Sequence, residues 1–510
     1  MKWEQGRLEM LHKKTYLFLF LIILNGTAVA KELSIYMGGS DKPPYHIHAS
    51  ARLLSTINAA VVGQLIRNDD GFNLKPGAIE YFNYDFDNDI YILRLRKNLV
   101  FHNGRKANSK DLEFTLTRGF YSPDHSFFKV YLGNILGIDS IKPGQKFETN
   151  LVRGIKIIDD FTISVKLNTP NPSFFHSLTV PYFSLVPIEE FESDYLTWKK
   201  WPIGTGKYKV QPPGFDGEKT ILEIVSTKDI ETHQPTRVII YNNLNSKVDI
   251  STTELIDKET KTYESSLPAS IALLTFSNKH PLSQDDNFKK GISYLINRES
   301  IKNKITEVSP VSQILPRHFW GRTQETDLYN LDLAKKYFSK IPKELLEKKY
   351  ELQIFSGNRL SQSQKLYTKE LERQFSLVGF KASFVPNSEK FESLETATKS
   401  PIFAWNIVCD YVDPLIMFSA FKRDGHSPYY GPKGKLQEKY ESYYLEASKS
   451  TSFESRNRTV KALSKFVKDE AIVIPVFEQK MIYKVDNKLV KDIGDQLNPI
   501  TLFVENIRMK

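Results

Sequence analysis

The chain has 510 residues and a mass of 58.8 kDa. Of its residues, 40% are hydrophobic, 25% are charged and 12% are aromatic. This composition excludes a disordered, fibrous or very small protein, and the length predicts about two to four domains. The single cysteine, Cys409, excludes internal disulfides and thiolate-ligated zinc or iron–sulfur sites. The formal charge of +10 is spread over the chain and is weak evidence for an acidic partner.

The first thirty residues have the pattern of a secretory signal peptide. Basic Lys13 and Lys14 precede the apolar run Tyr16 to Leu24, and Ala28-Val29-Ala30 fits a signal peptidase site. The run is shorter than the roughly 20 residues that cross a bilayer, which argues against a membrane anchor. We predict cleavage after Ala30.

Met10 directly precedes the more typical leader, so the true start is either Met1 or Met10. No later stretch is long and apolar enough to span a bilayer. We therefore expect a soluble protein exported to the periplasm. Cys409 is expected to be buried there, since its neighbours Ile407 and Val408 are apolar.

The periodicity of apolar residues predicts a mixed α and β fold. Alternation predicts strands at 90–95, 161–167, 220–225 and 237–241, with Ile90, Ile92 and Arg94 on one face of the first. Helical spacing predicts helices at 287–301 and 366–379, the second capped by Gly379. These helices are expected to pack on sheets.

The pattern of residues 95–118 predicts a strand, a turn at Asn103-Gly104 and a helix. Ser109 is a plausible N-cap, and Asp111 falls in the first turn, where the helix dipole favours an anion.

At this segment the chain resembles the extracellular solute-binding proteins that serve peptide, dipeptide and nickel import systems. The resemblance rests on motifs in family order over nearly the whole mature chain: Leu95-Arg96, Phe101-His102-Asn103-Gly104 and Asp111; Pro202-Ile203-Gly204-Thr205-Gly206-Lys207-Tyr208, with Lys207 in place of proline; Phe288 to Arg298, with Lys289 and Gly291 replacing arginine and alanine; Leu333-Ala334-Lys335-Lys336; Asp410-Tyr411-Val412-Asp413-Pro414; and Ile474-Pro475-Val476. Each motif alone is weak, but their order and spacing are specific.

The resemblance implies an α/β fold of the periplasmic binding protein type II class. It has two lobes joined by a hinge, with an extra domain inserted in the first lobe. By analogy, the divisions are residues 1–30 for the signal peptide, 31–50, 178–265 and 476–510 for lobe I, 51–177 for the extra domain, and 266–475 for lobe II, with hinges near 270–278 and 471–478.

The function that the resemblance implies is capture of short peptides in the cleft between the lobes and delivery to the permease of an ABC transporter. Ligand contacts to both lobes shift the protein toward its closed form. A monomer without cofactor is expected. Binding with little sequence preference depends on the peptide backbone and its charged ends.

In peptide-binding members an Asp of the Asp-Tyr segment binds the ligand's α-amino group, which by position is Asp410. A loop-capping role is its alternative. Tyr411 fits a pocket wall or the core equally. Trp405 is a candidate for ligand stacking, although core packing is favoured because the family's tryptophan position holds Ile407. Arg423 could pair with a peptide carboxylate, but a solvated loop is favoured.

The alternative function in the family is binding of nickel, a metal chelate or another non-peptide solute. His46 and His48 would share one face of a strand, a geometry that could hold such a metal, although Pro43-Pro44 favours a loop. No third histidine is tied to this pair by spacing, so no metal site is predicted.

An enzyme is not expected, because the sequence lacks the common nucleophile-elbow, zinc-protease and phosphate-loop motifs. Nucleic acid is not expected as a partner either, because the lysines are interspersed with acidic residues.

Overall fold

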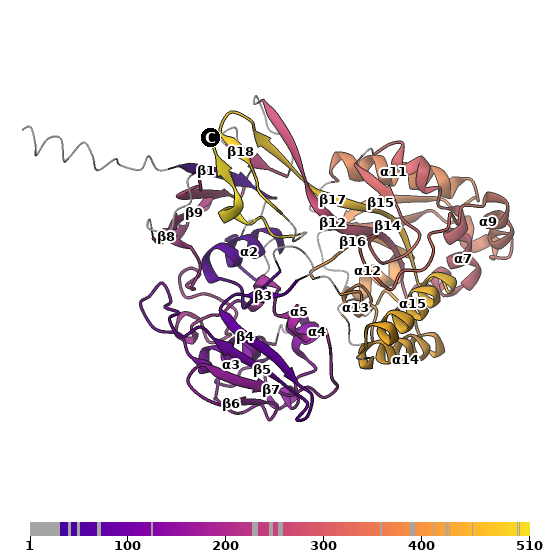
Figure 1. Cartoon of the computed structure of the whole chain (residues 1–510). Helices are drawn as coiled ribbons and strands as arrows, with labels where there is room; N and C mark the ends of the chain where they lie inside the picture. The colour runs from indigo at the N-terminus through magenta and orange to yellow at the C-terminus, as the bar shows by residue number, and fades with distance from the viewer. Residues whose placement is uncertain are drawn as a thin grey trace, which may run out of the picture.

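The protein is described by a computed structural model (Figure 1). The described residues are 31–38, 42–47, 51–68, 73–123, 126–226, 233–243, 248–252, 259–305, 307–356, 360–387, 393–411, 413–423, 425, 427, 429–450, 452–496, 498 and 500–510. The predicted signal peptide lies outside them. Within this part of the chain, no helix combines the length and apolar character needed to cross a membrane.

One large mixed sheet runs through both lobes of the molecule (Figure 1). Its strand order is β15-β14-β16-β12-β17-β11-β1-β10-β9-β8, with β13 paired to β17. The strands of lobe I are β1 (Glu32–Tyr36), β8 (Tyr208–Phe215), β9 (Lys219–Ile224), β10 (Arg237–Tyr241) and β11 (Ile250–Ser251). Those of lobe II are β13 (Val308–Pro310), β14 (Tyr350–Phe355), β15 (Ala382–Asn387) and β16 (Ile402–Val408).

Two long antiparallel strands connect the lobes: β12 (Thr260–Phe276) and β17 (Val473–Asp486). At one end β17 pairs with β11 of lobe I, and at the other β12 pairs with β16 of lobe II. The β12–β17 register shifts twice between Glu264 and Ser270, around Pro268. These strands include most of both predicted hinge segments, residues 270–276 and 473–478; the predicted domain boundaries themselves stay a prediction.

Lobe II has helices on both faces of its sheet. Because successive side chains of a strand point to opposite faces, Ile402 and Ala404 of β16 enter one core cluster, and Phe403 and Trp405 enter another. The helices of this lobe are α6 (Pro281–Gln284), α7 (Asp286–Leu295), α8 (Arg298–Lys302), α9 (Leu331–Phe338), α10 (Lys343–Leu346), α11 (Gln362–Ser376), α12 (Leu394–Lys399), α13 (Leu415–Ser419), α14 (Lys435–Lys449) and α15 (Phe453–Asp469).

The extra domain is built on a separate antiparallel sheet of order β4-β5-β7-β6 and lies below lobe I in Figure 1. Its strands are β4 (Ile79–Asp85), β5 (Ile90–Leu95), β6 (Ile155–Ile157) and β7 (Thr162–Val165), and its helices include α3 (Ser109–Thr117), α4 (Ser126–Leu132) and α5 (Phe174–Ser177). In β5, Tyr91, Leu93 and Leu95 are buried, whereas the face of Ile90, Ile92 and Arg94 is the more exposed one.

The remaining elements are short and connect the larger units. They are α2 (Ala51–Ile57), the π-helix η1 (Asn58–Val62), the 3-10 turns η2 (Arg118–Tyr121), η3 (Ile138–Ser140), η4 (Pro181–Phe183), η5 (Ile188–Glu190) and η6 (Val504–Asn506), and the strand pairs β2 (Ile66–Arg67) with β3 (Lys75–Pro76) and β18 (Val490–Asp492) with β19 (Arg508–Met509).

Two local predictions were wrong. The N-cap of α3 is Asn108 rather than Ser109; its side chain accepts from Lys110 N, and Asp111 completes a capping box by accepting from Asn108 N. The helix predicted over 287–301 is two helices, because the side chain of Asn297 accepts from Ser300 N and starts α8.

Two of the recognised sequence motifs contact each other where the extra domain joins lobe I. His102 N donates to Gly204 O at 2.9 Å, and His102 Nε2 lies 3.0 Å from Gly206 O. A Cβ at Gly204 would lie 2.2 Å from Val62 Cα, so only glycine permits this approach to η1.

Candidate solute-binding site

The carboxylate of Asp410 lies where the two sides of the molecule meet. Asp410 lies two residues after the end of β16, and the intervening Cys409 N donates to Ala269 O of the crossing strand β12 at 3.3 Å. From the extra domain, Tyr131 Oη of α4 donates to Asp410 Oδ2. A group bound at this carboxylate would therefore contact lobe II and the extra domain together.

The surroundings of Asp410 are aromatic and contain no neutralising cation within the described residues. The Tyr131 ring lies 5.4 Å from Phe183 and 6.0 Å from Tyr411, measured between centroids. Burial raises the pKa of Asp410 to about 6, and the Tyr131 hydrogen bond only partly offsets this effect. Asp410 is partly exposed as a residue, and no counter-ion among the described residues pairs with its carboxylate.

Tyr411, the neighbour of Asp410, lies on the same boundary but is 8% exposed. Its ring faces Tyr131 and His176, whose ring centroid is 6.5 Å away. Burial lowers the pKa of His176, which keeps the imidazole neutral at pH 7.

The second acidic residue of the segment, Asp413, has a structural role. Its carboxylate forms a bidentate ion pair with Arg456 of α15, with N–O distances of 2.7 and 3.0 Å, and both side chains are buried. Arg456 also donates to Ser173 Oγ, which precedes α5 of the extra domain. The pair therefore supports a second contact between lobe II and the extra domain, next to the start of α5.

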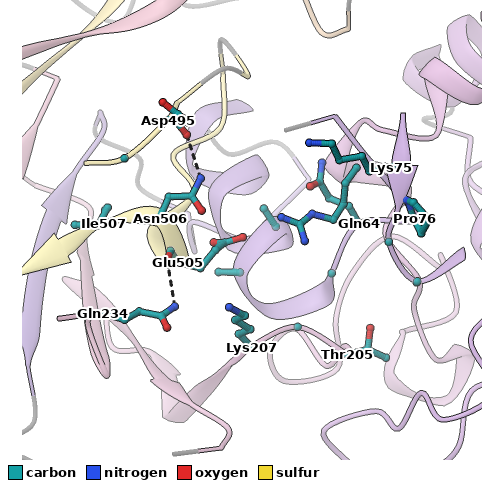
Figure 2. Close-up of a pocket in the computed structure, with 18 of the residues that line it drawn as sticks. Gln64, Lys75, Pro76, Thr205, Lys207, Gln234, Asp495, Glu505, Asn506 and Ile507 are labelled. Atoms are coloured by element: carbon teal, nitrogen blue, oxygen red, sulfur yellow. Dashed lines mark hydrogen bonds between the residues drawn. The ribbon is translucent and has the colours of Figure 1, made fainter. Parts of the chain in front are cut away.

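A separate cavity of about 710 Å³ lies between lobe I, the extra domain and the C-terminal segment (Figure 2). Figure 2 shows the amide of Gln234 donating to Glu505 O, and that of Asn506 donating to Asp495 O. Lys207, which replaces the proline of the family motif, also lines it. None of the four predicted ligand-binding residues lines this cavity.

The family model described as bacterial extracellular solute-binding proteins, family 5 (Middle), matches residues 73–222 and 241–429. These segments make up about two thirds of the chain. The chain belongs to this family.

Curated relatives match this family 5 protein over part of its length. The periplasmic oligopeptide-binding protein OppA of Escherichia coli (strain K12) is 26% identical over 268 residues, 48% of each chain. Heme-binding protein A of Haemophilus influenzae is 25% identical over 147 residues, 27% of this chain and 26% of that protein. The match to OppA is the longer of the two, and it spans about half the length of OppA.

Solved structures share the fold over nearly the full length. The murein tripeptide binding protein MppA of Escherichia coli has a TM-score of 0.75 at 16% identity and covers 95% of this chain and 99% of its own. NikZ of Campylobacter jejuni, solved with Ni(L-His), has a TM-score of 0.71 at 17% identity, with 91% and 95% covered. The predicted type II periplasmic binding fold is confirmed.

Two of the predicted ligand-binding residues of the family 5 protein, Trp405 and Arg423, have surroundings different from those of Asp410. Trp405 is 7% exposed in the core of lobe II, and its indole N–H donates to Thr275 Oγ1 at 3.2 Å. Arg423 is exposed and lines a cavity near the start of α14. Ligand contact by either residue stays a prediction.

Cys409 is buried, as predicted, and its Sγ lies 3.7 Å from Met417 Sδ. Burial raises the pKa of its thiol well above the usual value, with a further contribution from the nearby Asp410 carboxylate.

Cys409 is therefore expected to react with a disulfide reagent about tenfold or more slowly in the folded protein than after unfolding in urea, because little thiolate is present. A spectroscopic thiol assay measures both rates; equal rates would contradict the assignment of a shielded thiol.

The predicted histidine pair is only partly described. His46 N donates to Pro43 O at 2.9 Å, which places His46 in a turn, as the two prolines indicate. His48 lies outside the described residues. Over the described part of the chain, no group of three or more His, Cys, Asp or Glu side chains could hold a metal ion.

Sequence reasoning missed Tyr131, Ser173, His176 and Arg456 as members of this boundary. Tyr131 is 279 residues from Asp410, and Ser173 is 283 residues from Arg456. Local periodicity carries no information on such contacts. The sequence signal that could have drawn attention to this helix is its three aromatic residues, Phe127, Phe128 and Tyr131.

Proposed function

We propose that this chain is the periplasmic solute-binding component of an ABC importer, and that it captures short peptides between its lobes for a membrane permease. Family membership supports a solute-binding role. OppA and MppA, two of its relatives, are described as binding oligopeptides and a murein tripeptide. The observation that carries the peptide assignment is the shielded, unneutralised carboxylate of Asp410 at the boundary between lobe II and the extra domain.

In this proposal the α-ammonium of the peptide pairs with Asp410. The ion pair offsets the desolvation that raises the pKa of this carboxylate. Tyr131 can keep its hydrogen bond while the ligand takes the remaining acceptor sites, since a carboxylate offers about four. Contacts to both sides of the boundary then favour the closed form.

Closure is proposed to use the β12–β17 pair. The register shifts around Pro268 interrupt this ladder between its lobe I and lobe II portions. Where the ladder is interrupted, fewer regular hydrogen bonds between the strands have to be kept when the lobes rotate relative to each other. Hinges commonly consist of a few residues of this kind.

Peptide affinity is expected to fall by about tenfold between pH 7 and pH 5, because a proton competes with the ammonium for a carboxylate of pKa about 6. Burial raises the pKa values of the neighbouring Tyr131, Tyr182 and Cys409 and lowers that of His176, so each shift favours the neutral form.

Isothermal titration with one unmodified tripeptide at both pH values measures this change. The N-acetylated form of the same peptide is the matched control, since it lacks the ammonium and should bind at neither pH. Affinity that is independent of pH, or equal for the acetylated peptide, would contradict the role of Asp410.

A non-peptide solute is the alternative, because the neighbouring fold of NikZ holds Ni(L-His) and another relative is described as heme-binding. Nickel with histidine should not raise the melting temperature of the purified protein if the peptide proposal holds. A rise that saturates at one metal per chain would favour the alternative.

A further inference from the structure

The first turn of α2 carries a cation, Arg52, whose side chain has no hydrogen bond and no ion pair within the described residues. The residue is partly buried, and this burial lowers the pKa of its guanidinium. None of its nitrogen atoms is among the fully enclosed polar atoms that lack a partner, so a ligand can reach the group. A desolvated charge without a counter-ion is costly, which indicates an anionic ligand group.

Three buried arginines differ from Arg52, because protein acceptors bind their guanidinium groups. Arg118 and Arg298 donate to backbone carbonyls. Arg456 pairs with the carboxylate of Asp413. These three side chains therefore have structural roles, whereas the donors of Arg52 are available to a ligand.

Helix α2 is held on the lobe I side of the molecule. Thr56 Oγ1 accepts from Leu502 N of the C-terminal segment at 3.0 Å and lies 3.7 Å from the sulfur of Met37, which follows β1. Apolar residues of the same helix enter the main core cluster. Arg52 thus belongs to the lobe I side, whereas Asp410 belongs to lobe II.

The 3-10 turn η4 lies between α2 and Asp410. It packs on α2, and it contains Tyr182, whose pKa is raised by burial and by the Asp410 carboxylate. The ring of Phe183 in this turn lies 5.4 Å from that of Tyr131, which donates to Asp410. The helix that carries Arg52 and the carboxylate of Asp410 therefore border the same aromatic turn.

The crossing strands give the spacing of the two charges along the molecule. Arg52 interacts electrostatically with Tyr483 of β17. The residue before Asp410 bonds to Ala269 of β12, whose neighbour in the chain pairs with Lys480 of β17. Lys480 and Tyr483 are three positions apart, which is about 10 Å along a strand. An extended peptide of about three residues spans a similar length.

We propose that Arg52 binds the C-terminal carboxylate of a short peptide whose α-ammonium pairs with Asp410. This inference rests on the proposed peptide-binding function and specifies its ligand as a peptide of about three residues with both ends free. A guanidinium matches a carboxylate with two parallel hydrogen bonds. Because the two ends are held by different lobes, such a ligand favours the closed form.

Calorimetric titration of the full mature protein with trialanine and with its C-terminal amide tests this pairing. The wild-type protein is expected to bind trialanine about tenfold or more tightly than the amide, as is typical for a charged hydrogen bond. Arg52→Gln should weaken trialanine binding by a similar factor and leave the affinity for the amide nearly unchanged. Its melting temperature should not fall, because Arg52 has no hydrogen bond or ion pair to lose among the described residues.

The matched control is Arg153→Gln, because Arg153 is exposed and lies just before β6, the edge strand of the extra domain. This variant should keep the preference for the free carboxylate. Equal binding of trialanine and its amide by the wild type, with N-acetyl-trialanine still rejected, would overturn the role of Arg52 and leave the proposed function intact. An unchanged preference in Arg52→Gln, or equal losses for both ligands, would also overturn it. Failure of every tripeptide to bind would overturn both proposals.

Discussion

Replacing Asp410 by asparagine is expected to stabilise the unliganded protein at pH 7 and to abolish peptide binding. The folded-state pKa of about 6 lies above the ordinary value of 3.8, so the folded protein holds an ionised carboxylate at pH 7 at a cost of about 2 to 3 kcal/mol. Asparagine has nearly the same shape, carries no charge and can still accept from Tyr131.

The sign of this effect depends on pH. Because the pKa is raised on folding, the folded state binds more protons than the unfolded state between about pH 4 and pH 6, and stability falls as pH rises through that window. The gain in stability from Asp410→Asn is therefore absent below pH 4 and complete above pH 6. Thermal unfolding at pH 4 and pH 7, with calorimetric peptide titration, checks both parts. A lower melting temperature at pH 7, or retained affinity, would contradict the account.

Replacing Asp413 by alanine is expected to have the opposite effect on stability. This change leaves Arg456 buried without its carboxylate, and removing one partner of a buried pair typically costs about 3 to 5 kcal/mol. Asp410 and Asp413 stand three positions apart in one motif, so the two variants compare two neighbouring carboxylates with opposite expected effects.

A double variant identifies the cause of that loss. Asp413→Leu combined with Arg456→Met replaces both charges by apolar groups and should recover most of the stability, since such replacements are often neutral. Urea unfolding of the single and double variants measures the free energy of unfolding of each one. A loss below about 1 kcal/mol for Asp413→Ala would show that the pair is solvated.

The elements that the sequence predicted well are those fixed by local pattern. The predicted range Ile90–Leu95 matches β5 because its buried residues alternate along the strand. The range Arg237–Tyr241 matches β10, which is instead buried on both faces, since Val238 and Ile240 enter one core cluster and Ile239 and Tyr241 another. The break between α7 and α8 was missed, because apolar spacing continues through Ile296 while the side chain of Asn297 starts a new helix.

The site was predictable only where a family motif marks it. The Asp-Tyr-x-Asp-Pro pattern directed attention to Asp410, but periodicity could not distinguish its role from that of Asp413. The distinction comes from contacts across the fold: Tyr131 reaches Asp410, and Arg456 reaches Asp413. Burial of these groups is a property of the packed structure, so it could not be derived from the sequence.

The most direct test of the central claim is native mass spectrometry of the mature protein, purified gently and then incubated with a mixture of di- to pentapeptides. The account predicts one-to-one complexes with a series of short peptides, and no such complexes for Asp410→Asn. A single non-peptide mass that no peptide displaces, or the same peptide series on the variant, would contradict it.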